Sequence, residues 1–200
     1  QEVDRGARRQ RQKWIRDSVG RVKKSEGWTT QRVGPDMEHI CQTYFQNPNF
    51  YRIDGRPVIL LCVSRLLNGK GVLEDLTRIM RDTAREVCNT DIFIIGDQVW
   101  RSAPNSNEEY PPFKLLDAVT NYDIYGNMDN PPYGGQKAVD DYYLQQKEWS
   151  ERAGENGVGY VPDVSLGYND RGVWFERKDT GNYISMFCVP RLVMLIALGI

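Results

Sequence analysis

The chain has 200 residues, of which 40% are hydrophobic and 26% are charged, and its formal net charge is −1. This length allows one domain with a sizeable core, and the composition is that of a globular protein rather than a disordered chain. The charge is unevenly spread, because residues 1–24 carry nine Lys or Arg against three acids, a net +6 that leaves −7 on the remainder. A basic arm can bind nucleic acid but is more often a solvated helix or a frayed end, and the acidic remainder argues against a nucleic-acid channel.

The hydrophobic pattern predicts strands that alternate with helices. Apolar stripes at helical spacing predict helices over 36–46, 72–88 and 136–154. Unbroken or alternating apolar runs predict five strands, over 58–63, 92–97, 115–122, 158–164 and 191–198. The run "LVMLIALGI" that contains the last of these has nine residues, too few to span a bilayer. Such an order indicates a parallel α/β sheet, either a (β/α)8-type barrel or an open doubly wound sheet. We expect a basic N-terminal segment over 1–30 and one α/β domain over 31–200.

Metal and nucleotide cofactors are not expected from the motifs. The chain has one histidine, His39, and its cysteines show no C-x-x-C spacing, so a zinc site is disfavoured. Cys41 and Cys88 fall on apolar helix faces and Cys62 in an apolar strand, which predicts buried thiols. No strand is followed by a G-x-G-x-x-G or G-x-x-x-x-G-K-[ST] sequence. No cofactor is therefore predicted.

Polar and aromatic residues gather directly after the predicted strands. Ligands of parallel α/β folds meet the carboxyl ends of the strands, so these residues are the candidate site. Planar rings can stack on the apolar face of a sugar while carboxylates, amides and guanidinium groups bind its hydroxyls. The candidates for hydroxyl binding or proton transfer are Asp97 and Asp170. The candidates for substrate binding are Trp100, Asn121, Tyr122, Tyr125, Tyr168, Asn169 and Arg171.

Each of these residues also has a structural interpretation. Asp97 can cap the segment that follows it, and Asp170 with Arg171 can form a local ion pair that fixes the loop. Tyr122 and Tyr125 can pack on the rim of the sheet. The convergence of several strand ends on the same chemistry is a stronger signal than any one residue.

The segment "YFQNPNFYRIDGRPVILL", followed in order by "IIGDQVW", "LDAVTNYDIYG" and "YVPDVSLGYNDRG", resembles glycoside hydrolase family 99-like proteins, the relatives of endo-α-mannosidase. The resemblance covers roughly residues 36–175. It implies a (β/α)8 barrel, action on glycosidic bonds and binding of a polysaccharide or oligosaccharide at the carboxyl ends of the strands. It also slightly favours an extracellular or periplasmic location. A full barrel needs about 250 residues, so the barrel is expected to be partial, incomplete at both ends.

Two departures from the family bear on activity. The family usually has Pro-Gly where this chain has Leu166-Gly167. The family's catalytic acids lie in a "WNEW/Y-x-EG"-type loop, and no such motif occurs here. Glycoside hydrolysis ordinarily uses two carboxyl groups that flank the scissile bond. The catalytic residues are therefore not identified by motif, and Asp97 and Asp170 are the best candidates.

Two other classes of function compete with a glycoside hydrolase. One is a non-catalytic carbohydrate-binding or structural subunit, completed by a partner chain or by a second copy that covers exposed strand edges. The other is a sugar-nucleotide transferase on an open sheet, which the lack of a D-x-D-like pair in the strand-end loops disfavours. A nucleic-acid role for the basic arm would show itself as steeply salt-dependent binding.

Overall fold

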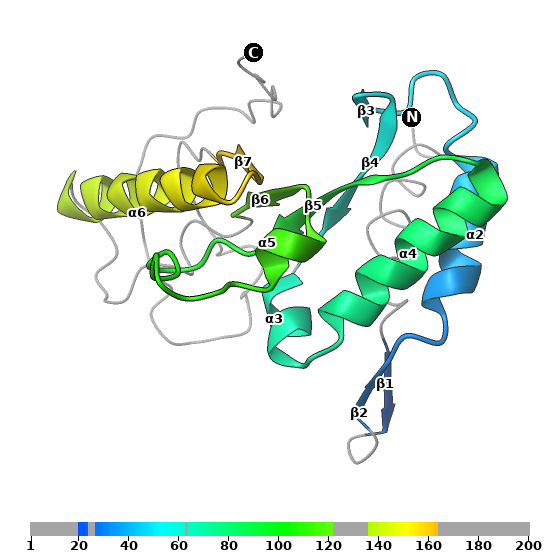
Figure 1. The fold of residues 1–200 in the computed structure, drawn as a ribbon, viewed down its shortest axis with the longest axis horizontal. Coiled ribbons are helices and arrows are strands. Elements are labelled where there is room, and N and C mark those ends of the chain that lie inside the picture. The colour runs from blue at the N-terminus through cyan, green and yellow to red at the C-terminus, as the bar shows by residue number, and fades with distance from the viewer. Residues whose placement is uncertain (1–19, 24–26, 63, 122–135, 164–200) are drawn as a thin grey trace, which may run out of the picture. The chain divides into compact units, whose positions relative to one another are not determined.

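The structure is a computed structural model that describes residues 20–23, 27–62, 64–121 and 136–163. The chain divides into two compact units. The first contains the described residues up to Gln98 together with Glu109–Val119, and the second contains Val99–Glu108 and the described residues from Thr120 onward. The elements, all labelled in Figure 1, follow the mixed α/β order expected from the sequence.

In the first unit, two strands form a hairpin. β3 (Arg52–Ile53) pairs antiparallel with β4 (Arg56–Leu61). The two residues between them, Asp54 and Gly55, have φ values of 51° and 76°. A two-residue turn with both φ angles positive matches the right-handed twist of the strands it joins, and Asp-Gly is a preferred sequence for it. The segment between the predicted helix over 36–46 and the predicted strand over 58–63 therefore contains a short strand.

Gly55→Ala is expected to lower the free energy of unfolding by about 1 kcal/mol, because a Cβ disfavours a left-handed backbone. The space around Gly55 is open, so conformational strain is the whole effect. Gly154→Ala is the matched control, since Gly154 is helical, lacks a positive φ and also has open space around it. That control is expected to leave the free energy of unfolding unchanged or to raise it by about 0.5–1 kcal/mol. Urea unfolding of both variants checks the prediction, and equal destabilisation would contradict it.

A parallel strand pair forms the centre of the first unit. β4 pairs parallel with β5 (Phe93–Asp97), with Val58 opposite Phe93 and Leu61 opposite Gly96. The two are connected through α3 (Ser64–Gly69) and α4 (Leu73–Cys88), and α5 (Pro112–Leu115) precedes β6 (Ala118–Thr120). The strand order is β3-β4-β5-β6-β7, where β7 is Gly159–Val161, and a separate sheet pairs β1 (Gly20–Lys23) with β2 (Gly27–Thr29).

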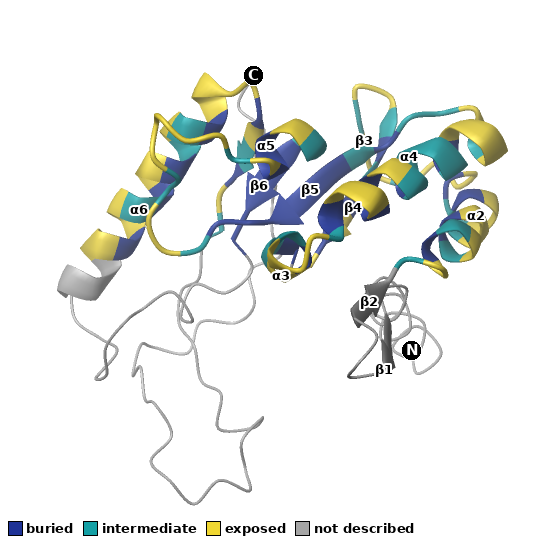
Figure 2. Ribbon diagram, turned by 60° about the horizontal axis from the view of Figure 1, so that its bottom comes forward, coloured by how far each residue is buried: buried dark blue, intermediate teal, exposed yellow. Residues whose placement is uncertain are grey.

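The sequence of α4 explains where this helix begins and where it ends. Its first turn carries Glu74 and Asp75, which suit the positive end of the helix dipole. It ends at Asn89, whose left-handed backbone lets its N–H donate to the carbonyls of Ala84 and Arg85. One side of the helix is buried, through Leu73, Leu76, Thr77, Met80 and Ala84. Figure 2 shows β5 almost entirely buried, whereas β4 alternates between buried and more exposed residues, and the outer turns of α4 are exposed.

The strand β4 differs from its prediction on one point. An unbroken apolar run was expected to be covered on both faces, and Pro57, Ile59 and Leu61 are indeed buried. Leu60, on the other face, is 39% exposed. Both faces of this strand are apolar, so the sequence lacks the alternation that would have distinguished them.

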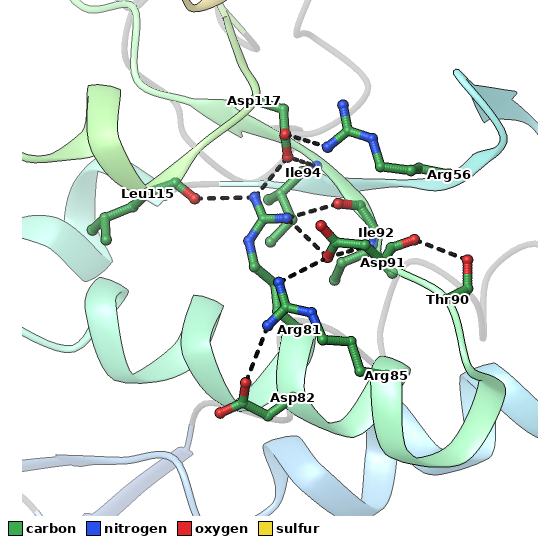
Figure 3. A network of polar contacts seen from close by, with 10 residues as sticks. All are labelled: Arg56, Arg81, Asp82, Arg85, Thr90, Asp91, Ile92, Ile94, Leu115 and Asp117. Carbon is green, nitrogen blue, oxygen red and sulfur yellow. Dashed lines mark hydrogen bonds and ion pairs between the residues drawn. The ribbon is translucent and has the colours of Figure 1, made fainter.

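A network of ion pairs lies at the amino ends of the strands in the first unit (Figure 3). Asp117, directly before β6, accepts hydrogen bonds from Arg56 at 2.6 Å, from Arg81 at 2.7 Å and from the backbone N–H of Ile94 at 2.8 Å. The Arg81 guanidinium also bonds Asp91 and the carbonyls of Ile92 and Leu115. One carboxylate and one guanidinium thus link α4 to the starts of three strands.

In the second unit, α6 (Gln136–Glu155) and β7 enclose a smaller core. Tyr142, Gln146, Trp149 and Ala153 are buried on one side of α6, at the spacing of a helical stripe. Thr120 donates its hydroxyl to the carbonyl of Val161 at 2.8 Å, next to the β6–β7 pairing. The helix predicted over 136–154 and the strand over 158–164 are confirmed with small shifts of their ends. The strand predicted over 191–198 lies outside the described residues.

Candidate functional site

The carboxyl ends of β4 and β5 carry a polar cluster in the first unit. Parallel strands place their carboxyl ends at one edge of the sheet, so the residues after β4 meet those after β5. Arg65, at the start of α3, forms an ion pair with Asp97, the last residue of β5, with 2.7 Å between Nη1 and Oδ2. Asp97 is 0% exposed and the Arg65 side chain is 22% exposed. The Arg65 side chain is therefore the part of the pair that reaches solvent.

A chain of three further hydrogen-bonding groups lies beside this pair. Gln98 donates its amide to the Ser64 hydroxyl at 2.8 Å and accepts from the Tyr110 hydroxyl at 2.7 Å. Ser64 and Gln98 are buried. The pKa of Tyr110 is raised to about 12, because burial outweighs the lowering effect of Arg65 and the charge of Asp97 adds to the rise. The phenol stays protonated at neutral pH, so it remains a donor and fixes the orientation of the Gln98 amide.

Close packing of Gly96 holds this edge together. A Cβ on Gly96 would lie 2.4 Å from Leu116 Cδ1 and 2.9 Å from Ser64 Oγ. Glycine therefore lets the start of α3 and the Leu116 side chain approach β5 directly. This approach brings Ser64 and Arg65 to the level of Gln98 and Asp97.

Cys62 follows β4 at the same edge and is exposed. Its pKa is raised, first by the partial desolvation of the sulfur and then by the negative charge of Asp97. A thiol with a raised pKa is a weak nucleophile at neutral pH. Cys62 is therefore better suited as an alkylation site that detects ligand bound at this edge than as a nucleophile that attacks a substrate.

The chemistry of this cluster is that of neutral polar recognition. Arg65 compensates the buried charge of Asp97, and its side chain is the more exposed member of the pair. Among the described residues, no group of three or more His, Cys, Asp or Glu is arranged to hold a metal ion. In the same part of the chain, no helix combines the length and the apolar character needed to cross a membrane.

Two other predicted site residues, Trp100 and Asn121, belong to the second unit. Asn121 is buried and donates its amide to the Tyr142 hydroxyl at 3.3 Å. Burial raises the pKa of Tyr142, although the hydrogen bond from Asn121 lowers it. Trp100 is partly exposed in the segment that follows β5.

The segment around Trp100 is held by two side chains of α6. Trp149 donates its indole N–H to the carbonyl of Arg101 at 2.9 Å, where the backbone of Arg101 has a φ of 54°. Arg152 Nη2 donates to the carbonyls of Asn105, Ser106 and Glu108 at 3.0–3.1 Å. Trp149 and Arg152 are three residues apart on the helix, a spacing that places them on one side of it.

The remaining predicted site residues lie outside the described residues. They are Tyr122, Tyr125, Tyr168, Asn169, Asp170 and Arg171. Sequence reasoning did not pair Arg65 with Asp97, although Ser64, Arg65 and Gln98 directly follow the strands predicted over 58–63 and 92–97. It missed Tyr110, which lies twelve residues after Gln98 and carries no motif that would have connected the two.

One solved structure is similar to this chain. It is named "Glycoside hydrolase-like protein" and matches 76% of this chain with a TM-score of 0.53 and 22% sequence identity. No protein-family model and no curated protein matches the sequence. The similarity shows that the matched part of this chain shares its α/β fold with that protein. The chain spans 42% of the length of that protein.

Proposed function

We propose that this chain is a carbohydrate-active protein of the glycoside hydrolase-like class, and that the strands belong to a partial (β/α)8 barrel. The observation that carries the proposal is the Arg65–Asp97 pair at the carboxyl ends of parallel β4 and β5. The glycoside hydrolase-like fold of the structural neighbour supports it. The relation to endo-α-mannosidase and the domain bounds of 31–200 remain predictions from the sequence.

Within this proposal, Arg65 and Asp97 have different roles, because their side chains differ in exposure. Asp97 is fully buried and orients the guanidinium, while the Arg65 side chain is 22% exposed and is the proposed contact to the hydroxyl oxygens of a sugar. If hydrolysis occurs, Asp97 and Asp170 are the proposed carboxyl groups. Trp100, Asn121, Tyr122, Tyr125, Tyr168, Asn169 and Arg171 are the proposed contacts to further parts of the substrate.

Arg65→Met is expected to weaken binding of the preferred oligosaccharide roughly 10–100-fold, the effect of losing one charge-assisted hydrogen bond. The ligand is first found by calorimetry on a panel of α-mannans and other polysaccharides. Arg78→Met is the matched control, because Arg78 also pairs with an aspartate, Asp75, but both side chains are more than half exposed. In parallel, ligand is expected to slow the alkylation of Cys62 by iodoacetamide. Unchanged affinity in Arg65→Met, with a folded protein by circular dichroism, would contradict the assignment of Arg65.

Cleavage of the same panel separates an enzyme from a binding protein. Turnover that is lost in Asp97→Asn supports a hydrolase. Intact polysaccharide with retained binding supports the second candidate, a non-catalytic carbohydrate-binding or structural subunit completed by a partner chain or a second copy. Leu60 on β4 is 39% exposed, and a partner bound at this strand would cover it. Absence of both cleavage and binding would overturn the carbohydrate proposal for this chain alone.

A further inference from the structure

The helices α2 (Val33–Thr43) and α4 lie side by side in the first unit (Figure 1). Their contact begins at Gly34, in the first turn of α2. A Cβ on this residue would lie 3.8 Å from Ile79 Cγ2 and 3.9 Å from Thr83 Oγ1, both on α4. The backbone of α2 therefore runs close to α4 at this level.

Two cysteines meet further along the same contact. Cys41 lies seven residues after Gly34, a rise of about 10 Å along α2, and Cys88 lies five residues after Thr83 at the end of α4. The two helices run in the same direction, which places the cysteines at one level, and Cys88 is close enough to Cys41 to raise the pKa of the Cys41 thiol. Gln46, just beyond α2, donates to Cys88 Sγ at 3.8 Å. The contact thus continues on both sides of the two thiols.

The two thiols differ in exposure. Cys41 is fully buried, whereas Cys88 is partly exposed. Burial and then the neighbouring Cys88 raise the pKa of Cys41 to about 12. Cys88 is therefore the thiol that a dissolved oxidant reaches first, and Cys41 is positioned behind it as the resolving thiol.

We propose that Cys41 and Cys88 are a dithiol site that oxidants of the disulfide class convert into an intramolecular disulfide linking α2 to α4. The Cys88 thiolate attacks the oxidant, forms a mixed disulfide and releases one small thiolate. The Cys41 thiol then attacks the Cys88 sulfur, its proton passes to the departing thiolate, and the second small thiol is released. The two protein thiols are oxidised by two electrons, and the small disulfide is reduced to two thiols.

The link is expected to stabilise the first unit. A disulfide between residues 41 and 88 restricts the unfolded chain over the whole segment that contains β4 and α4. The site is independent of the proposed carbohydrate function, because Arg65 and Asp97 take no part in it.

The test equilibrates the folded protein with oxidised glutathione and follows its mass and melting temperature. We expect the mass of the monomer to fall by two hydrogen atoms, and the proteolytic map to contain a peptide that joins Cys41 to Cys88. The Tm is expected to rise by roughly 5–10 °C, and dithiothreitol is expected to reverse the rise. Cys62→Ser is expected to behave like the parent protein. Cys88→Ser is expected to show neither the link nor the rise in Tm while keeping the parent circular dichroism spectrum. A stable mixed disulfide at Cys88, a link through Cys62, a disulfide dimer or no reaction at equilibrium would each overturn the proposal.

Discussion

Asp117→Ala is expected to lower the free energy of unfolding by about 3 kcal/mol, the largest effect of any single substitution proposed for this protein. The carboxylate accepts hydrogen bonds from two guanidinium groups and from the N–H of Ile94. Arg81 and Asp117 are 19% and 16% exposed, so water replaces the lost partner poorly. The substitution removes the carboxylate that pairs with Arg56 and leaves Arg81 with Asp91 as its remaining carboxylate partner. Urea unfolding at neutral pH measures the change.

The control for this substitution is Asp75→Ala. Asp75 also pairs with an arginine, at 2.9 Å, but it lies on the outer side of α4 and is 63% exposed. Exposed pairs of this kind contribute little, so the control is expected to change stability by no more than about 0.5 kcal/mol. Equal losses in the two variants would show that burial of the Asp117 network contributes nothing.

The same variant should change the response to acid. Burial raises the pKa of Asp117, but the N–H of Ile94 and the guanidinium groups of Arg81 and Arg56 together outweigh it, so the pKa is lowered. A carboxyl whose pKa is lowered by folding stabilises the protein above its unfolded pKa of about 4, and this contribution is lost as pH falls through the folded pKa. The difference in stability between the parent protein and Asp117→Ala should therefore shrink below about pH 4.

Gly96→Ala is expected to lower the free energy of unfolding by about 1–3 kcal/mol through overpacking. The added methyl group would lie 2.4 Å from Leu116 Cδ1 and 2.9 Å from Ser64 Oγ, so both side chains must move. Movement of Ser64 also disturbs its hydrogen bond with Gln98. Chemical denaturation measures the loss.

Two further variants test this explanation. Gly69→Ala, at the end of α3 with open space around it, is expected to be neutral or stabilising. Leu116→Ala removes the nearer of the two clashes, so the double variant Gly96→Ala/Leu116→Ala should lose less stability than the sum of the single losses. Additive losses would show that contact with Leu116 is not the reason for glycine at this position.

Periodic elements were the most predictable part of the fold. The apolar stripe over 72–88 predicted the start of α4 within one residue. Apolar residues at helical spacing mark the side of a helix that is buried, so the sequence alone reveals such a helix. The strand over 92–97 was predicted equally well. Short elements were missed, among them α3, α5 and the β1–β2 pair, since three to six residues carry too few periods to be recognised.

The candidate site was predictable by position but not by pairing. The rule that ligands meet the carboxyl ends of parallel strands correctly singled out Asp97 and its neighbours as residues that end a strand. It did not foresee that Asp97 would be fully buried, because burial depends on Arg65, which lies 32 residues earlier. Likewise, the thiols of Cys88 and Cys62 were expected to be buried, but one is partly exposed and the other is exposed. The spacing of apolar residues marks the inner side of an element and does not reveal how far its last turn extends beyond its neighbour.

The bonds that Trp149 and Arg152 make to the segment after β5 have a consequence for how this protein can change over evolutionary time. All four go to main-chain carbonyl oxygens, of Arg101, Asn105, Ser106 and Glu108, which every amino acid provides. The side chains of this segment can therefore be exchanged one at a time while its backbone keeps the same course. In natural evolution or in a laboratory library, the surface chemistry of this segment can therefore vary while the course of its backbone stays the same.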